Sequence, residues 1–139
     1  MYNPLSGRRV LVVEDEMMVA WLLQDMLTEL GCVVIGPAAS VGEALALIEV
    51  QGLDAAVLDV NLSGQMSYPV ADVLVARGVP FIFSTGYASN RLQEGYRMFP
   101  VLQKPYHMTE LSAALASRIA EATPSADLTP GSGNTPLAA

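Results

Sequence analysis

The sequence predicts an α/β fold in which helices cover both faces of a parallel five-stranded sheet. Two observations carry this prediction. Short apolar runs rich in β-branched residues recur five times along the chain, and segments with helical signals separate them. The runs are unbroken rather than alternating, which is typical of strands covered on both faces. Strands that alternate with helices through short loops pair in parallel, so the five runs are expected to form one sheet.

The five expected strands span residues 10–13, 33–35, 55–58, 79–83 and 101–102. The expected helices span residues 15–30, 44–48, 69–77, 88–96 and 110–119. Gly31 follows the first helix at the position where glycine commonly ends one. Ser40 and Glu43 form the pattern of a capping box, and Pro69 suits the first turn of a helix. Gly95 interrupts the fourth helix, which is therefore expected to be the weakest.

Length and composition indicate one domain with a tail. The chain has 139 residues, which is enough to bury a core. Residues 1–120 are expected to form the domain. From residue 121 onward the sequence is rich in Pro, Ser, Thr, Gly and Ala and lacks apolar periodicity. This composition predicts a disordered tail over residues 121–139.

Charge, hydropathy and cysteine content argue against several classes of function. Fourteen acidic residues against seven basic ones give a net charge of −7. Nucleic-acid binding needs clusters of basic residues and is therefore not expected. No apolar run approaches the roughly 18 residues that a membrane span needs. The single cysteine, Cys32, fits a cytoplasmic protein, and the N-terminus lacks a signal-peptide pattern.

Polar side chains follow four of the expected strands at their carboxyl ends. Glu14 and Asp15 follow the first strand, Asp59 the third, Thr85 the fourth, and Lys104, the only lysine in the chain, the fifth. In open α/β sheets, ligands bind in the crevice outside these strand ends. One polar residue after one strand is commonplace. Three carboxylates, a hydroxyl and a lysine on the same edge indicate a site.

This set of side chains suits phosphoryl transfer. Carboxylates gathered in one crevice raise one another's pKa unless a cation neutralises them, and oxygen ligands suit Mg²⁺. Lys104 and the Thr85 hydroxyl are expected to contact phosphoryl oxygens, which supplies the positioning and charge neutralisation that phosphoryl transfer requires. The alternative is structural, a buried Asp–Lys pair that holds the crevice together.

At these residues the sequence resembles the response-regulator receiver domain. The segments VLVVEDE, LDVNL, FSTGY and QKPY occur in the family's order and at its spacings, and the match covers about residues 8–120. The resemblance implies a flavodoxin-like doubly wound sheet in strand order 2-1-3-4-5. It also implies that Asp59 is a phosphoacceptor, which receives a phosphoryl group from a histidine kinase or a phosphorelay. Such a protein is a signalling domain rather than an enzyme.

The resemblance also assigns the residues around the acceptor. Glu14 and Asp15 stand at the positions of the family's acidic metal-binding pair, with Asp15 as the more direct Mg²⁺ ligand. Asn61 stands where a backbone carbonyl binds the metal. Thr85 matches the switch hydroxyl, and Lys104 matches the lysine that pairs with the phosphoryl group.

The sequence departs from the common family pattern at several positions. Many receivers carry an aromatic residue three positions before the lysine, where this chain has Val101. Leu62 and Ser63 replace the usual Met-Pro after the acceptor. With the segment PFIFSTGY, these features are similar to the single-domain FATGUY receivers, whose histidine kinases are typically of the HWE type. The protein is therefore expected to be a stand-alone receiver that signals by changing its partner binding.

The resemblance implies a cis peptide bond, and the sequence pattern predicts a mobile segment. The bond between Lys104 and Pro105 matches a cis peptide of the family. The segment from Gly86 to Phe99 contains few large apolar residues, and Val101 leaves space where an aromatic side chain would pack. This segment is therefore expected to be mobile.

The first expected helix contains more apolar residues than a core-facing stripe needs, because residues 17–23 are all apolar. The residues expected to face the sheet are Val19, Leu22, Leu23 and Met26. The large side chains left outside are Met17, Met18 and Trp21. Exposed Met and Trp indicate a docking surface, and this end of the helix is near the acceptor, so the histidine kinase is expected to dock there. The alternative is that the N-terminal segment or the tail covers these side chains.

Three other functions fit the sequence less well. A flavodoxin-like nucleotide- or flavin-binding module would carry a Ser/Thr/Gly-rich loop where this chain has Glu14, Asp15 and Glu16. A phosphatase with an aspartyl-phosphate nucleophile would carry a second acid where this chain has Asn61. A pseudoreceiver interaction domain is never phosphorylated, whereas here every side chain that phosphorylation needs is present.

Overall fold

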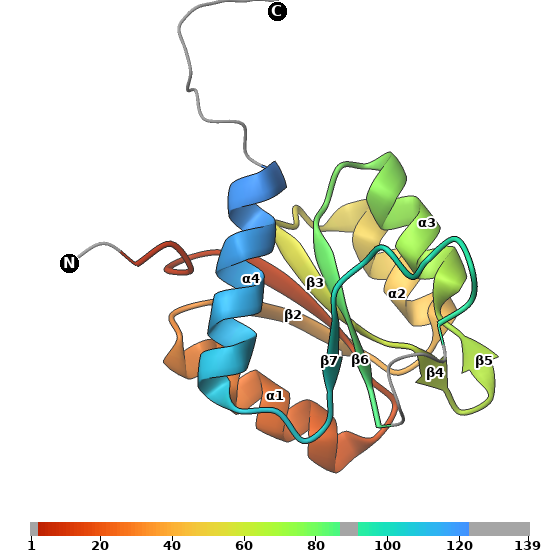
Figure 1. Cartoon of the computed structure of the whole chain (residues 1–139), viewed down its shortest axis with the longest axis horizontal. Helices are drawn as coiled ribbons and strands as arrows, with labels where there is room; N and C mark the ends of the chain where they lie inside the picture. Colours follow the sequence, from red (N-terminus) through yellow and green to blue (C-terminus); the bar gives the residue numbers. More distant parts are fainter. Residues whose placement is uncertain (1–2, 87–91, 123–139) are drawn as a thin grey trace, which may run out of the picture.

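A five-stranded parallel sheet runs through the centre of the molecule (Figure 1). The computed structural model describes residues 3–86 and 92–122. The strands of the sheet are β1 (Arg9–Val13), β2 (Val33–Ala38), β3 (Ala55–Asp59), β6 (Phe81–Thr85) and β7 (Val101–Gln103). Their order across the sheet is β2-β1-β3-β6-β7. This is the predicted order 2-1-3-4-5, so the doubly wound fold is confirmed.

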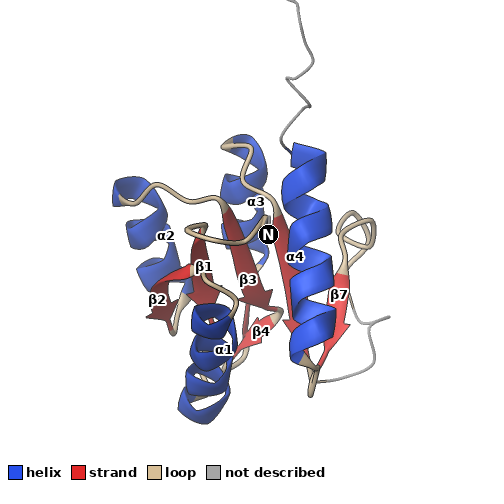
Figure 2. Ribbon diagram, turned by 90° about the vertical axis from the view of Figure 1, so that its left-hand side faces the viewer, coloured by secondary structure: helices blue, strands red, loops and turns tan. Residues whose placement is uncertain are grey.

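Within the described residues, four helices cover the two faces of the sheet. They are α1 (Met17–Glu29), α2 (Val41–Val50), α3 (Tyr68–Ala76) and α4 (Met108–Ala122). Figure 2 shows α1 and α4 on one face of the sheet and α2 and α3 on the other. None of the four is both long enough and apolar enough to cross a bilayer.

Each face of the sheet has its own hydrophobic core. Leu11 and Val13 of β1 contribute to the core under α2 and α3, whereas Val10 and Val12 contribute to the core under α1 and α4. Successive side chains of a strand point to opposite faces, so a strand covered on both faces needs apolar residues at every position. This requirement explains the unbroken apolar runs in the sequence.

The ends of the helices follow the expected signals. The Ser40 hydroxyl caps α2 by accepting a hydrogen bond from the Glu43 backbone N–H at 3.1 Å. The Glu43 carboxylate in turn accepts from the backbone N–H of Ala39 at 2.8 Å. Reciprocal capping is therefore present, although Glu43 reaches one residue further back than expected. Pro69 lies in the first turn of α3, and Gly31 adopts a φ of +93° after α1.

The predicted inward face of α1 was wrong in one respect. The helix buries Ala20, Leu23 and Leu27, whereas Leu22, which was expected to face the sheet, is 55% exposed. The residues that α1 buries are three and four positions apart, which is the spacing of one helical face. Leu22 therefore joins the exposed surface of this helix.

The predicted fourth helix and the tail also differ from the structure. In the expected helix 88–96, residues 92–96 form bends and turns, and residues 87–91 lie outside the described part of the chain. The last helix, α4, continues through Ala122 and therefore includes the first two residues of the expected tail. Residues 123–139 lie outside the described residues, so tail disorder stays a prediction.

A small antiparallel hairpin follows β3 and was not predicted. It consists of β4 (Asn61–Leu62) and β5 (Gln65–Met66). Strands of two residues are too short to show periodicity, so the sequence carries no strand signal there. The Lys104–Pro105 bond is cis, as the resemblance implied, and the Gly36–Pro37 bond is also cis.

Candidate functional site

A crevice of about 420 Å³ opens at the carboxyl ends of the central strands. The residues that line it are Asp15, Glu16, Asp59, Asn61, Ser63, Gly64, Thr85, Gly86 and Lys104. The set includes all but one of the site residues selected from the sequence. The remaining one, Glu14, is buried and contacts the Lys104 side chain. The structure therefore brings the whole predicted constellation together.

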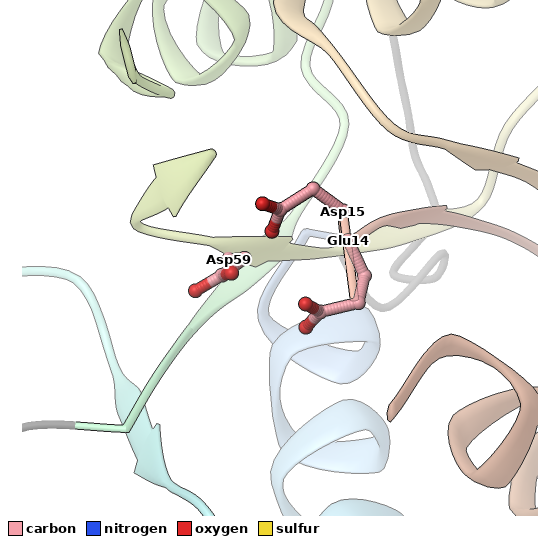
Figure 3. Close-up of side chains that lie close together, drawn as sticks. All are labelled: Glu14, Asp15 and Asp59. Atoms are coloured by element: carbon pink, nitrogen blue, oxygen red, sulfur yellow. The ribbon is translucent and has the colours of Figure 1, made fainter. Parts of the chain in front are cut away.

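Strand pairing explains why the carboxylates meet. Val13 of β1 lies opposite Leu58 of β3, so the next residues along the two strands, Glu14 and Asp59, emerge side by side. Glu14, Asp15 and Asp59 each offer a carboxylate oxygen within 4.8 Å of the others. Figure 3 shows the three side chains gathered around one space at the strand ends. Three acidic groups at this spacing repel one another unless cations neutralise them.

The environment of Asp59 makes its ionised form unfavourable. Burial is the largest cause, the charge of Glu14 adds to it, and together they raise the pKa of Asp59 from 3.8 to about 7. Lys104 opposes this rise but does not cancel it. A further cation in the crevice would therefore stabilise the ionised form of Asp59.

Lys104 supplies the positive charge of the site. Its Nζ atom lies 2.7 Å from Glu14 Oε1, 3.4 Å from Asp59 Oδ2 and 4.0 Å from Glu16 Oε1. Burial alone would lower the pKa of Lys104, but the hydrogen bond to Glu14 and the charge of Asp59 raise it overall. The ammonium group therefore stays charged and joins the end of β7 to the ends of β1 and β3.

Both carboxylate oxygens of Glu14 are engaged. Oε1 accepts from Lys104, and Oε2 accepts from the backbone N–H of Glu16 at 3.1 Å. Asp15 is half-buried at the crevice, where it accepts a hydrogen bond from the Ser63 hydroxyl. Asp15 and Asp59 are therefore better placed than Glu14 for direct contact with a metal ion.

Thr85 lies buried at the end of β6, where it lines the crevice. Its backbone carbonyl accepts a hydrogen bond from the backbone N–H of Lys104 at 2.7 Å. This bond continues the pairing of β6 with β7, in which Thr85 lies opposite Gln103. The hydroxyl residue and the lysine are thus held at neighbouring strand ends.

Sequence reasoning did not identify Ser63 as part of the site. Ser63 lies in the turn of the β4–β5 hairpin, and its hydroxyl donates to Asp15 Oδ2. In the same turn, the Asn61 side chain accepts from the backbone N–H of Gly64 at 2.7 Å. The dipeptide Ser-Gly after the acceptor strand was the available signal, because Gly in a two-residue loop is typical of tight hairpins.

The expectation that few large side chains anchor residues 86–99 was wrong for the described part. Leu92 is buried, and Tyr96 stacks on Tyr68 with ring centroids 4.2 Å apart. The Phe99 ring packs 4.7 Å from the ring of Phe81. These aromatic rings pack in the core next to the position where Val101 replaces an aromatic. Tyr87, which follows Gly86, lies outside the described residues.

The exposed apolar side chains of α1 form a patch beside the crevice. Its members are Met17, Met18, Trp21 and Leu22, and each is more than half exposed. The described N-terminal segment does not cover this patch, because Asn3 and Gly7 bind the backbone at Leu30 and Gly31, at the other end of α1. An apolar cleft of about 100 Å³ lies next to the patch, between α1 and the segment from Lys104 to Tyr106.

The donor set of the crevice fits Mg²⁺. Mg²⁺ prefers oxygen ligands, uses one or two carboxylates and keeps several waters or phosphate oxygens. Asp15 and Asp59 supply two carboxylates from neighbouring strands, and the crevice leaves room for water and phosphate. Burial and the charge of Glu14 raise the pKa of Asp59, and a divalent cation bound beside it would favour its ionised form.

Comparison with protein families gives one match that covers most of the chain. A family model described as "Response regulator receiver domain" matches residues 10–116. Among curated proteins, the transcriptional regulatory protein PdtaR of Mycobacterium tuberculosis is 29% identical over 123 residues. That match covers 84% of this chain but only 60% of PdtaR, so the chain spans about 60% of the length of its curated relative.

Many solved structures share this fold, and two of them illustrate the similarity. SdrG from Sphingomonas melonis is 42% identical with a TM-score of 0.74, and the match covers 85% of this chain and 99% of SdrG. The receiver domain of the sensor histidine kinase PA1611 from Pseudomonas aeruginosa is 28% identical with a TM-score of 0.67. That match covers 82% of this chain and 98% of the domain, which was solved with a magnesium ion in its active-site cleft.

Proposed function

The chain belongs to the response regulator receiver domain family, and we propose that Asp59 accepts a phosphoryl group from a histidine kinase with Mg²⁺ as cofactor. The observation that most supports this is the position of Asp59. Its carboxylate lies at the crevice beside two other carboxylates and 3.4 Å from the Lys104 ammonium. In the reaction, an oxygen of Asp59 bonds to phosphorus while the bond between phosphorus and the kinase imidazole breaks.

The neighbouring side chains supply charge and position in this proposal. Asp15, Asp59 and the Asn61 backbone carbonyl would hold the metal, and the buried Glu14 would add negative charge next to it. When bound, Mg²⁺ neutralises the charge on the phosphoryl oxygens. Lys104 needs only a small movement away from Glu14 to pair with a phosphoryl oxygen, because its ammonium already lies at the crevice.

Thr85 is proposed to donate its hydroxyl to another phosphoryl oxygen. Its place at the end of β6, one strand away from Asp59, supports this role. A shift of Thr85 toward the phosphoryl group would move the backbone that binds Lys104. Phosphorylation of Asp59 would in this way change the conformation of the adjoining surface and alter the binding of a protein partner.

The α1 patch is the proposed docking surface for the kinase. A kinase must bring its phosphohistidine to Asp59, so the surface around the crevice must receive it. Met18 and Trp21 are exposed in the N-terminal half of α1, which begins directly after the crevice residue Glu16. Large apolar side chains of this kind are common anchors at interfaces. The cleft between α1 and Pro105 would accept a side chain of the partner. The sequence similarity to FATGUY receivers favours a kinase of the HWE type.

A stand-alone receiver is the proposed organisation. The SdrG match, which covers 99% of SdrG, shows that a similar protein exists at this size. The proposed output is a change in protein binding, because the net charge of −7 does not favour contact with nucleic acid.

A phosphoryl analogue tests the proposed chemistry. SdrG has been solved in a BeF3-activated conformation. Adding beryllofluoride with Mg²⁺ should shift the amide resonances of crevice residues in the wild-type chain, and Asp59→Ala or a chelator should abolish the shifts. Asp25→Ala, at an exposed acid of α1, is the matched control. Shifts that persist in Asp59→Ala would contradict the assignment of the acceptor.

A further inference from the structure

The β4–β5 turn places a serine beside the proposed metal site. Leu62 pairs with Gln65, so Ser63 and Gly64 are the two central residues of the turn. Both have positive φ, +53° for Ser63 and +94° for Gly64. These values are typical of a type I′ turn, the usual two-residue connection of a hairpin. The Gly64 N–H also donates to the Asn61 side chain, which ties the turn to the first strand of the hairpin.

Serine is not the residue type that this turn favours. Type I′ turns prefer Asn or Gly at the first central position, because positive φ is costly for most other residues. Ser63 is the one residue other than glycine with a positive φ within residues 3–86 and 92–122. A side chain held in a disfavoured backbone conformation at the edge of a site points to a function for that side chain.

The Ser63 hydroxyl contacts a predicted metal ligand. It donates a hydrogen bond to Oδ2 of Asp15, which lies 48 positions earlier in the sequence at the end of β1. A glycine would satisfy the turn equally well but would leave Asp15 without this donor. The bond also ties the hairpin to β1, across the mouth of the crevice that Ser63 and Gly64 line.

We propose that Ser63 is a positioning residue that orients Asp15 for Mg²⁺, an inference that rests on the proposed function. Metal-ligating carboxylates are themselves held by hydrogen bonds, and losing such a partner typically lowers metal affinity by about 10–100-fold. Asp15 is half-buried and rotates more easily than a core residue. Because Ser63 holds one carboxylate oxygen, the Asp15 side chain is already oriented before the metal binds. Metal binding therefore costs less side-chain conformational entropy.

Mg²⁺ titration of two variants by isothermal titration calorimetry tests this role. Ser63→Ala removes the hydroxyl and keeps Cβ, whereas Ser63→Gly removes the hydroxyl and also relieves the cost of positive φ. Both should bind Mg²⁺ about tenfold more weakly than wild type. In chelator, Ser63→Gly should melt at or above the wild-type temperature, so its loss of affinity is not a loss of fold. Gln65→Ala, in the same hairpin but outside the crevice lining, should bind Mg²⁺ like wild type.

The outcomes separate this inference from the proposed function. If wild type binds Mg²⁺ and Asp15→Asn does not, but both Ser63 variants bind as wild type does, then Ser63 has no positioning role. If only Ser63→Gly binds more weakly, the flexibility of the turn is responsible and the inference is wrong. If wild type fails to bind Mg²⁺, or Asp15→Asn binds it equally well, the proposed metal site itself is wrong and this inference falls with it.

Discussion

Lys104 lies closer to Glu14 than to Asp59, with its Nζ atom 2.7 Å from Glu14 Oε1 and 3.4 Å from Asp59 Oδ2. Glu14 is the more deeply buried carboxylate, with its side chain 2% exposed against 9% for Asp59. The lysine therefore neutralises a buried acid before any phosphoryl group arrives. Asp59, the proposed phosphoacceptor, interacts with this ammonium group at the longer distance and therefore more weakly.

Removing the lysine should destabilise the fold in the absence of metal. Lys104→Met leaves the buried Glu14 carboxylate without its cation, which typically costs about 3 kcal/mol. Urea denaturation in chelator measures the change. Mg²⁺ binding should survive because lysine is not a metal ligand, but the conformational response to beryllofluoride should weaken.

The matched control for this prediction neutralises the partner as well. Glu14→Gln combined with Lys104→Met removes both charges, so the double variant should recover a large part of the stability that Lys104→Met loses. Equal stability of the single and double variants would mean that Glu14 is not the group stabilised by Lys104.

The raised pKa of Asp59 predicts that wild-type stability falls as pH increases. The folded chain holds the proton up to about pH 7, whereas an unperturbed carboxyl loses it near 3.8. Stability is therefore greatest below the unfolded pKa and is lost as pH rises through the folded pKa. Asp59→Asn cannot ionise, so in chelator at pH 8 it should be more stable than wild type, by on the order of 3 kcal/mol.

The same comparison at pH 4 should give much closer stabilities, because pH 4 lies only just above the unfolded pKa of 3.8 and little of the ionisation penalty has developed there. Asp25→Asn, at an exposed position of α1, should leave the pH dependence unchanged. Saturating Mg²⁺ should stabilise wild type but not Asp59→Asn at pH 8. If Asp59→Asn were stabilised by the same amount at pH 4 and pH 8, ionisation of Asp59 would not be the cause.

Phe99 should contribute measurably to stability, because its ring packs against Phe81 and Phe83 at centroid distances of 4.7 and 6.2 Å. The ring is only partly buried, so Phe99→Ala is expected to cost about 2 kcal/mol. Its neighbour Met98 is 78% exposed, and Met98→Ala should change stability by less than about 0.5 kcal/mol. Thermal denaturation of both variants checks the difference, and equal effects would place Phe99 outside the core.

Trp21→Ala should slow phosphoryl transfer from the kinase by about tenfold or more, because interface aromatics often carry much of the binding energy. Phosphorylation by a small phosphodonor should stay nearly unchanged, since it needs only the crevice. Val50→Ala, at an exposed apolar residue of α2 on the opposite face, is the control. If both rates fell together, the effect would come from the fold or the crevice, and the docking surface would be elsewhere.

The sheet and the position of the site could be predicted from the sequence because one physical rule governs both. A strand covered on both faces must be apolar throughout, so its carboxyl end appears as an abrupt change to polar residues. Asp59, Thr85 and Lys104 each lie at such a change. Parallel strands end on the same edge, and this gathers residues that are far apart in the sequence.

The finer features depend on side-chain geometry that the sequence does not encode locally. Hydropathy cannot show that Ala20 is buried and Leu22 exposed. All residues from 17 to 23 are apolar, so the pattern does not indicate which side of the helix faces the sheet. Three carboxylates near one lysine do not reveal that Glu14 makes the shortest contact. Ser63 escaped notice because its partner, Asp15, lies 48 positions away and the hairpin between them is too short to predict.

Intact mass after incubation with a small phosphodonor tests the central claim most directly. In Mg²⁺, wild type should gain the mass of one phosphoryl group, and it should lose that group slowly once the donor is removed. Asp59→Ala should gain none, a chelator should prevent the gain in wild type, and Asp25→Ala should behave as wild type does. A phosphoryl adduct that forms on Asp59→Ala, or that forms equally well in chelator, would contradict the assignment of Asp59 as an Mg²⁺-dependent phosphoacceptor.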